Sequence, residues 1–161
     1  TSGNATLTTN TVAAITNQPI DSTVCNGTIA GFMVTGTGTG VTYQWQQGPS
    51  VTGPFTNVST GTGGTTASYN TPATTPAMNN TYYRVILTTT TCAATVTSNV
   101  VKLTVNTIAN ITTQPLAQSA CVPNVATFTV SAIGHRRTYK WQISTNDGTT
   151  FTEITGATSE T

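Results

Sequence analysis

Apolar and polar residues alternate along several short segments of the chain. The clearest segments are residues 30–34, 43–46, 83–87 and 101–105. In an extended strand, a period of two places every second side chain on the same face. Each segment therefore predicts a short β-strand with one buried face. In the second of them, Tyr43 and Trp45 are the predicted inward residues and glutamines are the outward ones.

The stretches between these segments favour turns, and the composition favours strands. Glycine- or proline-bearing stretches cover residues 36–40, 48–54 and 71–79, which is typical of turns. Threonine supplies about a quarter of the 161 residues, and its branched side chain suits the pleated backbone of a sheet. Only 6% of the residues are charged, compared with about 25% in ordinary globular domains. We predict an all-β protein with a surface rich in hydroxyl groups.

A repeat of 96 residues runs through the chain without gaps. It aligns Cys25 with Cys121 and Trp45 with Trp141. About two dozen of the sixty-odd aligned positions are identical, and such self-similarity marks a modular array. The alignment predicts the final strand of a preceding repeat at 1–12, a complete repeat at 14–106 and the N-terminal part of a second repeat at 110–161. We expect the chain to be a segment of a longer polymer of such repeats.

Short motifs within the repeat indicate a known kind of domain. Tyr43-Gln44-Trp45-Gln46 is followed by Tyr82-Tyr83-Arg84-Val85 and then by Ser98-Asn99-Val100-Val101. This order resembles the immunoglobulin-like tandem repeats of large Bacteroidota cell-surface and adhesin-type secreted proteins. The resemblance implies tandem immunoglobulin-like β-sandwiches of Greek-key topology. It also implies that Trp45 is the core tryptophan of strand C and that Tyr83 takes the strand F position of a tyrosine corner.

Alternation and repetition together predict the core. Its members are apolar or aromatic and lie at inward positions of the predicted strands. In the complete repeat they are Phe32, Val34, Tyr43, Trp45, Tyr83, Val85 and Leu103, and in the second repeat they are Phe128, Tyr139 and Trp141.

The three cysteines leave three pairings open. Cys25 precedes the predicted strand B and Cys92 follows strand F, so immunoglobulin topology puts them at opposite ends of a sandwich. One alternative is a bridge within the repeat, which is common in secreted modules. The second is a bridge between one repeat and the next, and the third is free thiols. Cys121 has no partner within this chain under either bridging scheme.

The sequence offers little that could perform catalysis or hold a metal. The four acids, Asp21, Asp147, Glu153 and Glu160, lie in separate segments, and His135 is the single histidine. No pair of acids is placed to divide acid and base roles, and no second metal-binding residue lies at ligand spacing from His135. We predict a protein that is not an enzyme and has no cofactor. A net charge of +1 and the lack of a long apolar run argue against nucleic acid, anionic lipid and a membrane span as well.

A basic cluster distinguishes the second repeat from the first. It consists of His135, Arg136, Arg137 and Lys140, and it lies in the loop between the predicted strands B and C. Loops at the ends of a sandwich carry recognition in many proteins, so this is a possible recognition loop. A solvated loop without a partner is the favoured alternative, because short runs of charge are common on surfaces.

Several residues are candidate acceptors for glycans. Asn26, Asn57 and Asn110 begin Asn-x-Ser/Thr triplets, although so many hydroxyl residues produce several such triplets by chance. Ser22 and Thr23 follow Asp21, and this motif resembles the short acidic acceptor of O-glycosylation in Bacteroidota.

These features lead to one function and two alternatives. We expect an extracellular, cell-surface repeat module of a secreted bacterial protein that forms an extended stalk, filament or adhesin. Its partners would be neighbouring repeats or subunits of the same type, together with surface glycans or other cells. The first alternative is an accessory module, binding carbohydrate or a protein partner, of a larger secreted enzyme. The second is a subunit that polymerises by strand donation, in which residues 1–11 complete another copy.

Overall fold

The computed structural model describes residues 3–161 and divides into two compact units. Unit 1 ends at Asn106, and unit 2 comprises residues 107–161. The described residues form short strands joined by turns and irregular segments, with a single 3-10 turn, η1 (Pro76–Met78). The prediction of an all-β fold with immunoglobulin-like sandwich architecture is confirmed.

The larger sheet of unit 1 is built around two long neighbouring strands. β5 and β8 pair antiparallel along all eight residues of each. The strand order is β2-β10-β8-β5-β6, with β9 also pairing with β8, and β2 runs parallel to β10. The bounds are β2 (Ser22–Cys25), β5 (Val41–Gly48), β6 (Thr56–Asn57), β8 (Tyr82–Thr89), β9 (Thr95–Thr97) and β10 (Val101–Asn106).

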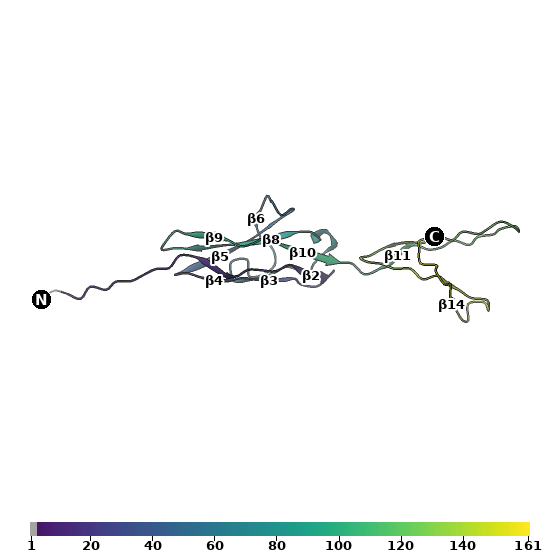
Figure 1. Ribbon diagram of the computed structural model, residues 1–161, viewed down its shortest axis with the longest axis horizontal. Helices are drawn as coiled ribbons and strands as arrows, with labels where there is room; N and C mark the ends of the chain where they lie inside the picture. The colour runs from purple at the N-terminus through teal and green to yellow at the C-terminus, as the bar shows by residue number, and fades with distance from the viewer. Residues whose placement is uncertain (1–2) are drawn as a thin grey trace. The chain divides into compact units, whose positions relative to one another are not determined.

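Two short antiparallel ladders form the second layer of unit 1. β3 pairs with β7, and β1 pairs with β4. Their bounds are β1 (Ala14–Asn17), β3 (Gly31–Met33), β4 (Thr35–Thr37) and β7 (Ser68–Asn70). In Figure 1, β3 and β4 run along one side of unit 1, and β8 and β9 run along the other. Every second residue of each strand therefore faces the space between the layers.

The core of unit 1 fills that space with aromatic and branched side chains. Phe32 and Tyr83 lie with their ring centroids 4.8 Å apart, and Trp45 and Tyr69 lie 6.1 Å apart. Tyr69 is as buried as the predicted core residues but was absent from the predicted set. Tyr43 is only partly buried and packs against the edge of the core. The buried members of this core are Ala30, Phe32, Val34, Trp45, Tyr69, Tyr83, Val85, Leu87, Val101, Leu103 and Val105.

Tyr83 departs from the tyrosine-corner expectation. In that motif the phenolic hydroxyl hydrogen-bonds to the backbone. Tyr83 is fully buried, yet its hydroxyl has no hydrogen-bond partner in the described part of the chain. The tyrosine-corner hydrogen bond is therefore absent, and burial raises the pKa of the Tyr83 hydroxyl far above its usual value.

Unit 2 repeats the pairing of unit 1 with the offset of 96 residues. β11 (Asn110–Thr113) pairs with β12 (Ser131–Ile133). The register of this pair shifts between Ile111 and Thr113, just as the register of β1 and β4 shifts between Ile15 and Asn17. β13 (Gln142–Ile143) pairs with β14 (Thr152–Glu153) in the register of β5 and β6. The repeat seen in the sequence is thus a repeat of backbone hydrogen bonding.

Phe128 and residues 3–12 differ from what the sequence predicted. Phe128 was predicted as core, but it is 44% exposed, because none of residues 107–161 packs on it as Tyr83 of β8 packs on Phe32 in unit 1. A final strand was predicted within 1–12, but residues 3–12 form none and are exposed. An extended segment becomes a strand only when an edge pairs with it. Residues 1 and 2 of that segment lie outside the described residues.

Candidate functional site

The basic cluster of unit 2 is tied into a network with an acid and a phenol. The Arg137 guanidinium donates from Nε to Tyr139 Oη at 2.8 Å and from Nη2 to Glu160 Oε1 at 3.2 Å. The Tyr139 hydroxyl in turn donates to the same Glu160 oxygen at 2.7 Å. Charge-assisted hydrogen bonds of this kind are short and directional. They hold Arg137 in place and neutralise its charge locally.

Lys140 also has an ion-pair partner, so the net positive charge around the cluster is smaller than its four residues alone suggest. Lys140 Nζ lies 3.1 Å from Glu153 Oε1. His135 and Arg136 are exposed, and neither has an ion-pair partner among residues 3–161. The acids had seemed isolated along the sequence, and only folding brings Glu153 and Glu160 to the loop. Two of the four predicted recognition residues therefore have their charge matched within unit 2.

Acid titration should release the network around Glu160. The Tyr139 hydroxyl, followed by Arg137, lowers the pKa of Glu160 below its usual value. A carboxyl group with a lowered folded-state pKa contributes stabilisation that is present above its unfolded pKa and lost as the pH falls through the folded pKa. We expect the Tyr139 ring and Arg137 Nε resonances, followed by NMR from neutral to acidic pH, to shift together at a pH below that of an ordinary glutamate. Glu160→Gln should abolish that step, and a step unchanged in this variant would contradict the assignment.

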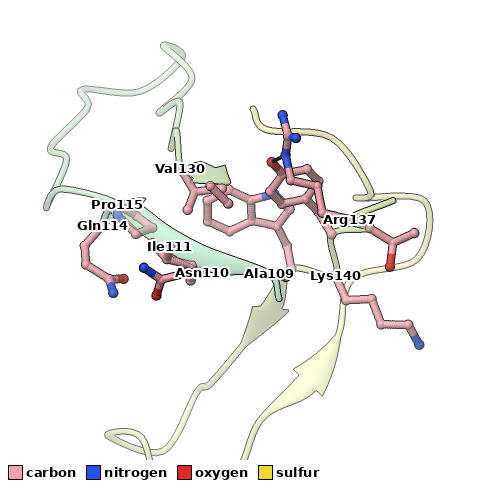
Figure 2. Close-up of a pocket in the computed structure, with 12 residues that line it drawn as sticks. Ala109, Asn110, Ile111, Gln114, Pro115, Val130, Arg137 and Lys140 are labelled. Atoms are coloured by element: carbon pink, nitrogen blue, oxygen red, sulfur yellow. Dashed lines mark hydrogen bonds between the residues drawn. The ribbon is translucent and has the colours of Figure 1, made fainter. Parts of the chain in front are cut away.

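A groove of about 340 Å³ opens beside this network. Ile111, Val130 and Trp141 supply apolar surface, and Arg137 and Lys140 lie at its polar side. Figure 2 shows the β11 side of the groove facing the side that carries these two cations, and the Lys140 side chain extends away from β11. The groove thus combines an apolar floor with charges that already have partners.

In unit 1, β8 lies beside β5 at the equivalent place. Trp45, the counterpart of Trp141, pairs with Val85 of β8, and Tyr43 pairs with Leu87. Leu87 reaches Gly36, the counterpart of Ala132, which lines the groove in unit 2. In unit 1, the Leu87 side chain thus fills the place that corresponds to this groove. The groove of unit 2 brings together no pair of groups suited to acid–base chemistry.

The remaining acidic residues offer no metal-binding group within residues 3–161, and Asp21 has a contact of its own. Residues 3–161 hold no group of three or more histidine, cysteine or acidic side chains that could bind a metal. Asp21 serves the backbone, because its carboxylate accepts a hydrogen bond from the Lys102 amide at 2.8 Å. Among the same residues, no helix is long and apolar enough to cross a membrane.

Comparison with known proteins assigns a family to the larger part of the chain. A family model described as "Domain of unknown function (DUF8696)" matches residues 13–107, which is more than half of the 161 residues. The chain belongs to the DUF8696 family. No curated protein matches its sequence.

Solved structures similar to the DUF8696 chain are immunoglobulin-domain proteins. Immunoglobulin domains 1–5 of Sidekick-1 match with a TM-score of 0.59 at 12% identity, over 84% of this chain and 28% of theirs. The titin I-band fragment I67–I69 gives 0.57 at 12% identity, over 89% and 48%. Drosophila OTK extracellular domains 3–5 give 0.53 at 11% identity, over 83% and 44%. The chain spans less than half the length of each, and at such identities the likeness concerns the fold alone.

The cysteines of the DUF8696 domain lie at different ends of unit 1. Cys25 ends β2 and pairs with Asn106, the last residue of β10. Cys92 lies in the turn that follows Thr89, the last residue of β8. Cys25, Cys92 and Cys121 are all free and exposed.

The strand register gives the distance between the two ends of unit 1 that hold Cys25 and Cys92. Lys102 pairs with Tyr82, so Asn106 lies four residues beyond one end of β8, and Thr89 closes the other end seven residues along. At roughly 3.3 Å per residue, the two ends are about 36 Å apart. A disulfide requires Cα atoms within about 7 Å. A bridge within the DUF8696 domain is therefore excluded by the fold, and this pairing alternative is wrong.

The candidate glycan acceptors of the chain are mostly accessible. Asn26, Asn57, Asn110 and Thr23 are exposed, and Ser22 is partly buried within β2. The Asn57 side chain accepts a hydrogen bond from the Gln46 amide at 3.0 Å, which occupies its oxygen and leaves its nitrogen free. Accessibility permits modification at these positions, and their use as acceptors stays a prediction.

Proposed function

We propose that the DUF8696 domain is a spacer and display module of an extracellular array, in which repeats follow one another to form a stalk, filament or adhesin. It would act without catalysis, through its reach and its surface. The observation that carries this proposal is that the chain arrives at one end of unit 1 and leaves at the other.

The arrival end is defined by contacts around the first ordered turns. The Thr11 amide donates to Thr39 Oγ1 at 3.0 Å, and the Thr39 amide donates to the Thr11 carbonyl at 3.1 Å. Val41, two residues after Thr39, pairs with Thr89 at the far end of β8. The chain therefore enters at the Cys92 end of unit 1.

The departure end lies opposite. β10 ends at Asn106, whose carbonyl accepts a hydrogen bond from the Asn26 amide at 2.8 Å. The chain thus crosses about 36 Å of sandwich between arrival and departure, at roughly 3.3 Å per residue. A module with this path advances an array by its own length at each repeat, as solenoid and tandem proteins do.

The surface chemistry supports a role outside the cell as a spacer. With few charges and a net charge of +1, the domain has no strong field to attract polyanions. Exposed threonine side chains keep the surface hydrated and offer positions for glycans.

Electron microscopy of the native protein released from cells tests this proposal. Beaded fibres with a period close to one sandwich, about 40 Å for a domain of this type, would support it. Compact particles in which these repeats surround a distinct enzyme domain would contradict it and favour an accessory role.

The same geometry leads us to propose a covalent link between successive repeats. Cys25 lies at the departure end and Cys92 at the arrival end of unit 1. In an array, the departure end of one repeat meets the arrival end of the next. The Cys25 thiol of one repeat and the thiol equivalent to Cys92 in the next repeat would be oxidised to a disulfide. The electrons would pass to a thiol–disulfide oxidant such as oxidised glutathione.

Peptide mapping of native, unreduced protein checks the link. We expect the Cys25 peptide to be joined to a peptide carrying the Cys92 counterpart of the following repeat, and the Cys121 peptide to be joined in the same way to a later one. A matched sample alkylated after reduction provides the control. Recovery of all three cysteines as free thiols would contradict the link, and a Cys25–Cys92 pair from one repeat would contradict the fold.

A further inference from the structure

The outer face of the larger sheet of unit 1 carries an arginine without an acidic partner. On β8, Tyr83 and Val85 are buried between the layers, so Arg84 between them lies on the opposite, outer face. Arg84 is partly buried, and no carboxylate in the described part of the chain forms an ion pair with it. Its charge is therefore unmatched, unlike the charges of the two paired cations in unit 2.

The Arg84 guanidinium is held in place by its neighbours on β5 and in the loop that follows. Its Nε donates to Gln46 Oε1 at 2.9 Å, and Gln46 Nε2 donates in turn to Asn57 Oδ1 at 3.0 Å. The Arg84 Cζ atom lies 4.2 Å from the centroid of the Phe55 ring, which is a cation–π contact. Because these contacts fix the side chain before a ligand arrives, binding costs less conformational entropy.

Two glycines allow the Phe55 ring to lie beneath this guanidinium. A Cβ at Gly48 would lie 3.1 Å from Phe55 Cδ1, and a Cβ at Gly53 would lie 2.9 Å from Phe55 Cδ2. Gly53 also has a φ of +90°, which side chains rarely adopt. The equivalent positions of unit 2 hold Ser144 and Thr149. The aromatic support of Arg84 is therefore particular to unit 1.

The two Nη groups of Arg84 are open to a ligand. Neither of them donates a hydrogen bond to another described residue. The buried side-chain atoms of residues 3–161 that lack a partner are Tyr83 Oη and Asn106 Oδ1, so solvent reaches both Nη groups. Their planar fork matches the two oxygens of a carboxylate or of a phosphate in a bidentate pair.

The charges around Arg84 favour a single carboxylate over a polyanion. Lys102 pairs with Tyr82, which places it on the same face, diagonally across from Arg84. The Asp21 carboxylate accepts a hydrogen bond from the Lys102 amide at 2.8 Å, so a negative charge lies beside Lys102. Polyanions such as nucleic acids need several cations in a row. One unmatched guanidinium instead balances one carboxylate.

The rest of the face favours a sugar over a peptide as the carrier of that carboxylate. β5 and β8 pair along their whole length, so their backbone groups are used in the ladder, and an extended peptide adds only to an exposed edge. The neighbouring side chains offer a free amide nitrogen at Asn57 and a free amide oxygen at Gln44. Amide groups of this kind exchange hydrogen bonds with hydroxyls, which a sugar ring supplies.

We propose that this arginine site binds a uronic acid, a sugar whose ring carries a carboxylate. The two carboxylate oxygens would accept hydrogen bonds from the Arg84 Nη groups. Ring hydroxyls would accept a hydrogen bond from Asn57 Nδ2 and donate one to Gln44 Oε1. The proposal goes beyond the spacer role and does not depend on it, because unit 1 would bind the sugar whether or not repeats form an array.

NMR titration of the whole chain with glucuronate at constant ionic strength tests the proposal. We expect saturable shifts of the Arg84 Nε–H and Asn57 side-chain resonances, with a Kd of about 1 mM, as suits one sugar residue. Glucose has the same ring without the carboxylate, and it should bind at least about tenfold more weakly because the charge-assisted hydrogen bonds are lost. A glutamate dipeptide with both ends capped supplies carboxylates without the ring and should also bind at least about tenfold more weakly.

Three variants separate recognition by Arg84 from a general effect of charge. Arg84→Gln removes one positive charge and should lower the affinity for glucuronate at least about tenfold. Lys102→Gln removes the same charge from the same face and is the matched control, which should leave the affinity nearly unchanged. Arg84→Lys keeps the charge but lacks the planar fork, so we expect a native spectrum of the buried β8 amides together with a similar loss of affinity.

Several results would overturn the proposal. They are an absence of saturable shifts with glucuronate, equal binding of glucose or of the capped dipeptide, and an equal loss of affinity in Lys102→Gln and Arg84→Gln. Native affinity in a folded Arg84→Lys would do the same, because it would show that charge alone attracts the ligand.

Discussion

Replacing Trp45 by alanine should lower the free energy of unfolding of unit 1 by about 3–5 kcal/mol, the usual range for removing a large buried aromatic side chain. Trp45 is fully buried in β5. Its indole Nε1 donates to the Thr66 carbonyl at 2.9 Å, and its ring lies beside Phe32 and Tyr69. Alanine would leave a cavity between the layers and a carbonyl without its donor. Urea unfolding, followed by the hydrogen exchange of the β5 and β8 amides, measures the loss.

The repeat supplies a matched control in Trp141. Trp141 occupies the equivalent position in unit 2, and its Nε1 also donates to a carbonyl, that of Ser159, at 2.9 Å. Its side chain is only partly buried, because among residues 107–161 no strand pairs with the Trp141 segment as β8 pairs with β5 at Trp45. Trp141→Ala should therefore leave the exchange of the β5 and β8 amides unchanged. Equal losses in unit 1 from the two substitutions would show that burial is not the cause.

Substituting alanine for Gly36 should destabilise unit 1 by about 1–3 kcal/mol through overpacking. A Cβ at Gly36 would lie 2.1 Å from Leu87 Cδ2 and 3.3 Å from the Ala14 carbonyl oxygen. Leu87 is fully buried in β8, so it has little room to move. The midpoint of urea unfolding, monitored by the near-ultraviolet circular dichroism of the core aromatics, should fall accordingly.

A second substitution identifies the clash. Leu87→Val removes the δ carbons that the new Cβ would meet, so the cost of Gly36→Ala should be smaller in this background than in the native protein. Unit 2 already carries alanine at the equivalent position, Ala132, and none of the described residues that line the groove with it is a leucine. If the cost of Gly36→Ala stayed the same in the Leu87→Val background, the destabilisation would come from the Ala14 backbone instead.

The fold was accessible from sequence because it depends on local periodicity and on repetition. Alternation along residues 30–34, 43–46 and 83–87 predicted which side chains enter the core, and the repeat predicted which pairs of strands recur. Both signals follow from backbone geometry, since a strand turns every second residue to the same face. The sequence did not predict Tyr69 as a core residue, because β7 is only three residues long and is too short to show an alternating pattern.

The candidate sites were far less accessible, because they depend on groups distant in sequence. His135, Arg136, Arg137 and Lys140 suggested an exposed cationic loop, but Glu153 and Glu160 fold against two of them. The sequence showed these acids only as scattered residues. Likewise, no periodicity distinguishes a tyrosine with a satisfied hydroxyl from one without.

By itself, the sequence determined that this protein is an all-β repeat with immunoglobulin-like sandwich architecture, because strand periodicity and self-similarity are properties of the chain read along its length. Only the tertiary structure decided that Cys25 and Cys92 cannot pair within unit 1 and that the Tyr83 hydroxyl is buried without a hydrogen-bond partner among the described residues. It also decided that Phe128 stays exposed. Each of these outcomes depends on which strand lies across from which, and long-range pairing sets distances that no local pattern contains.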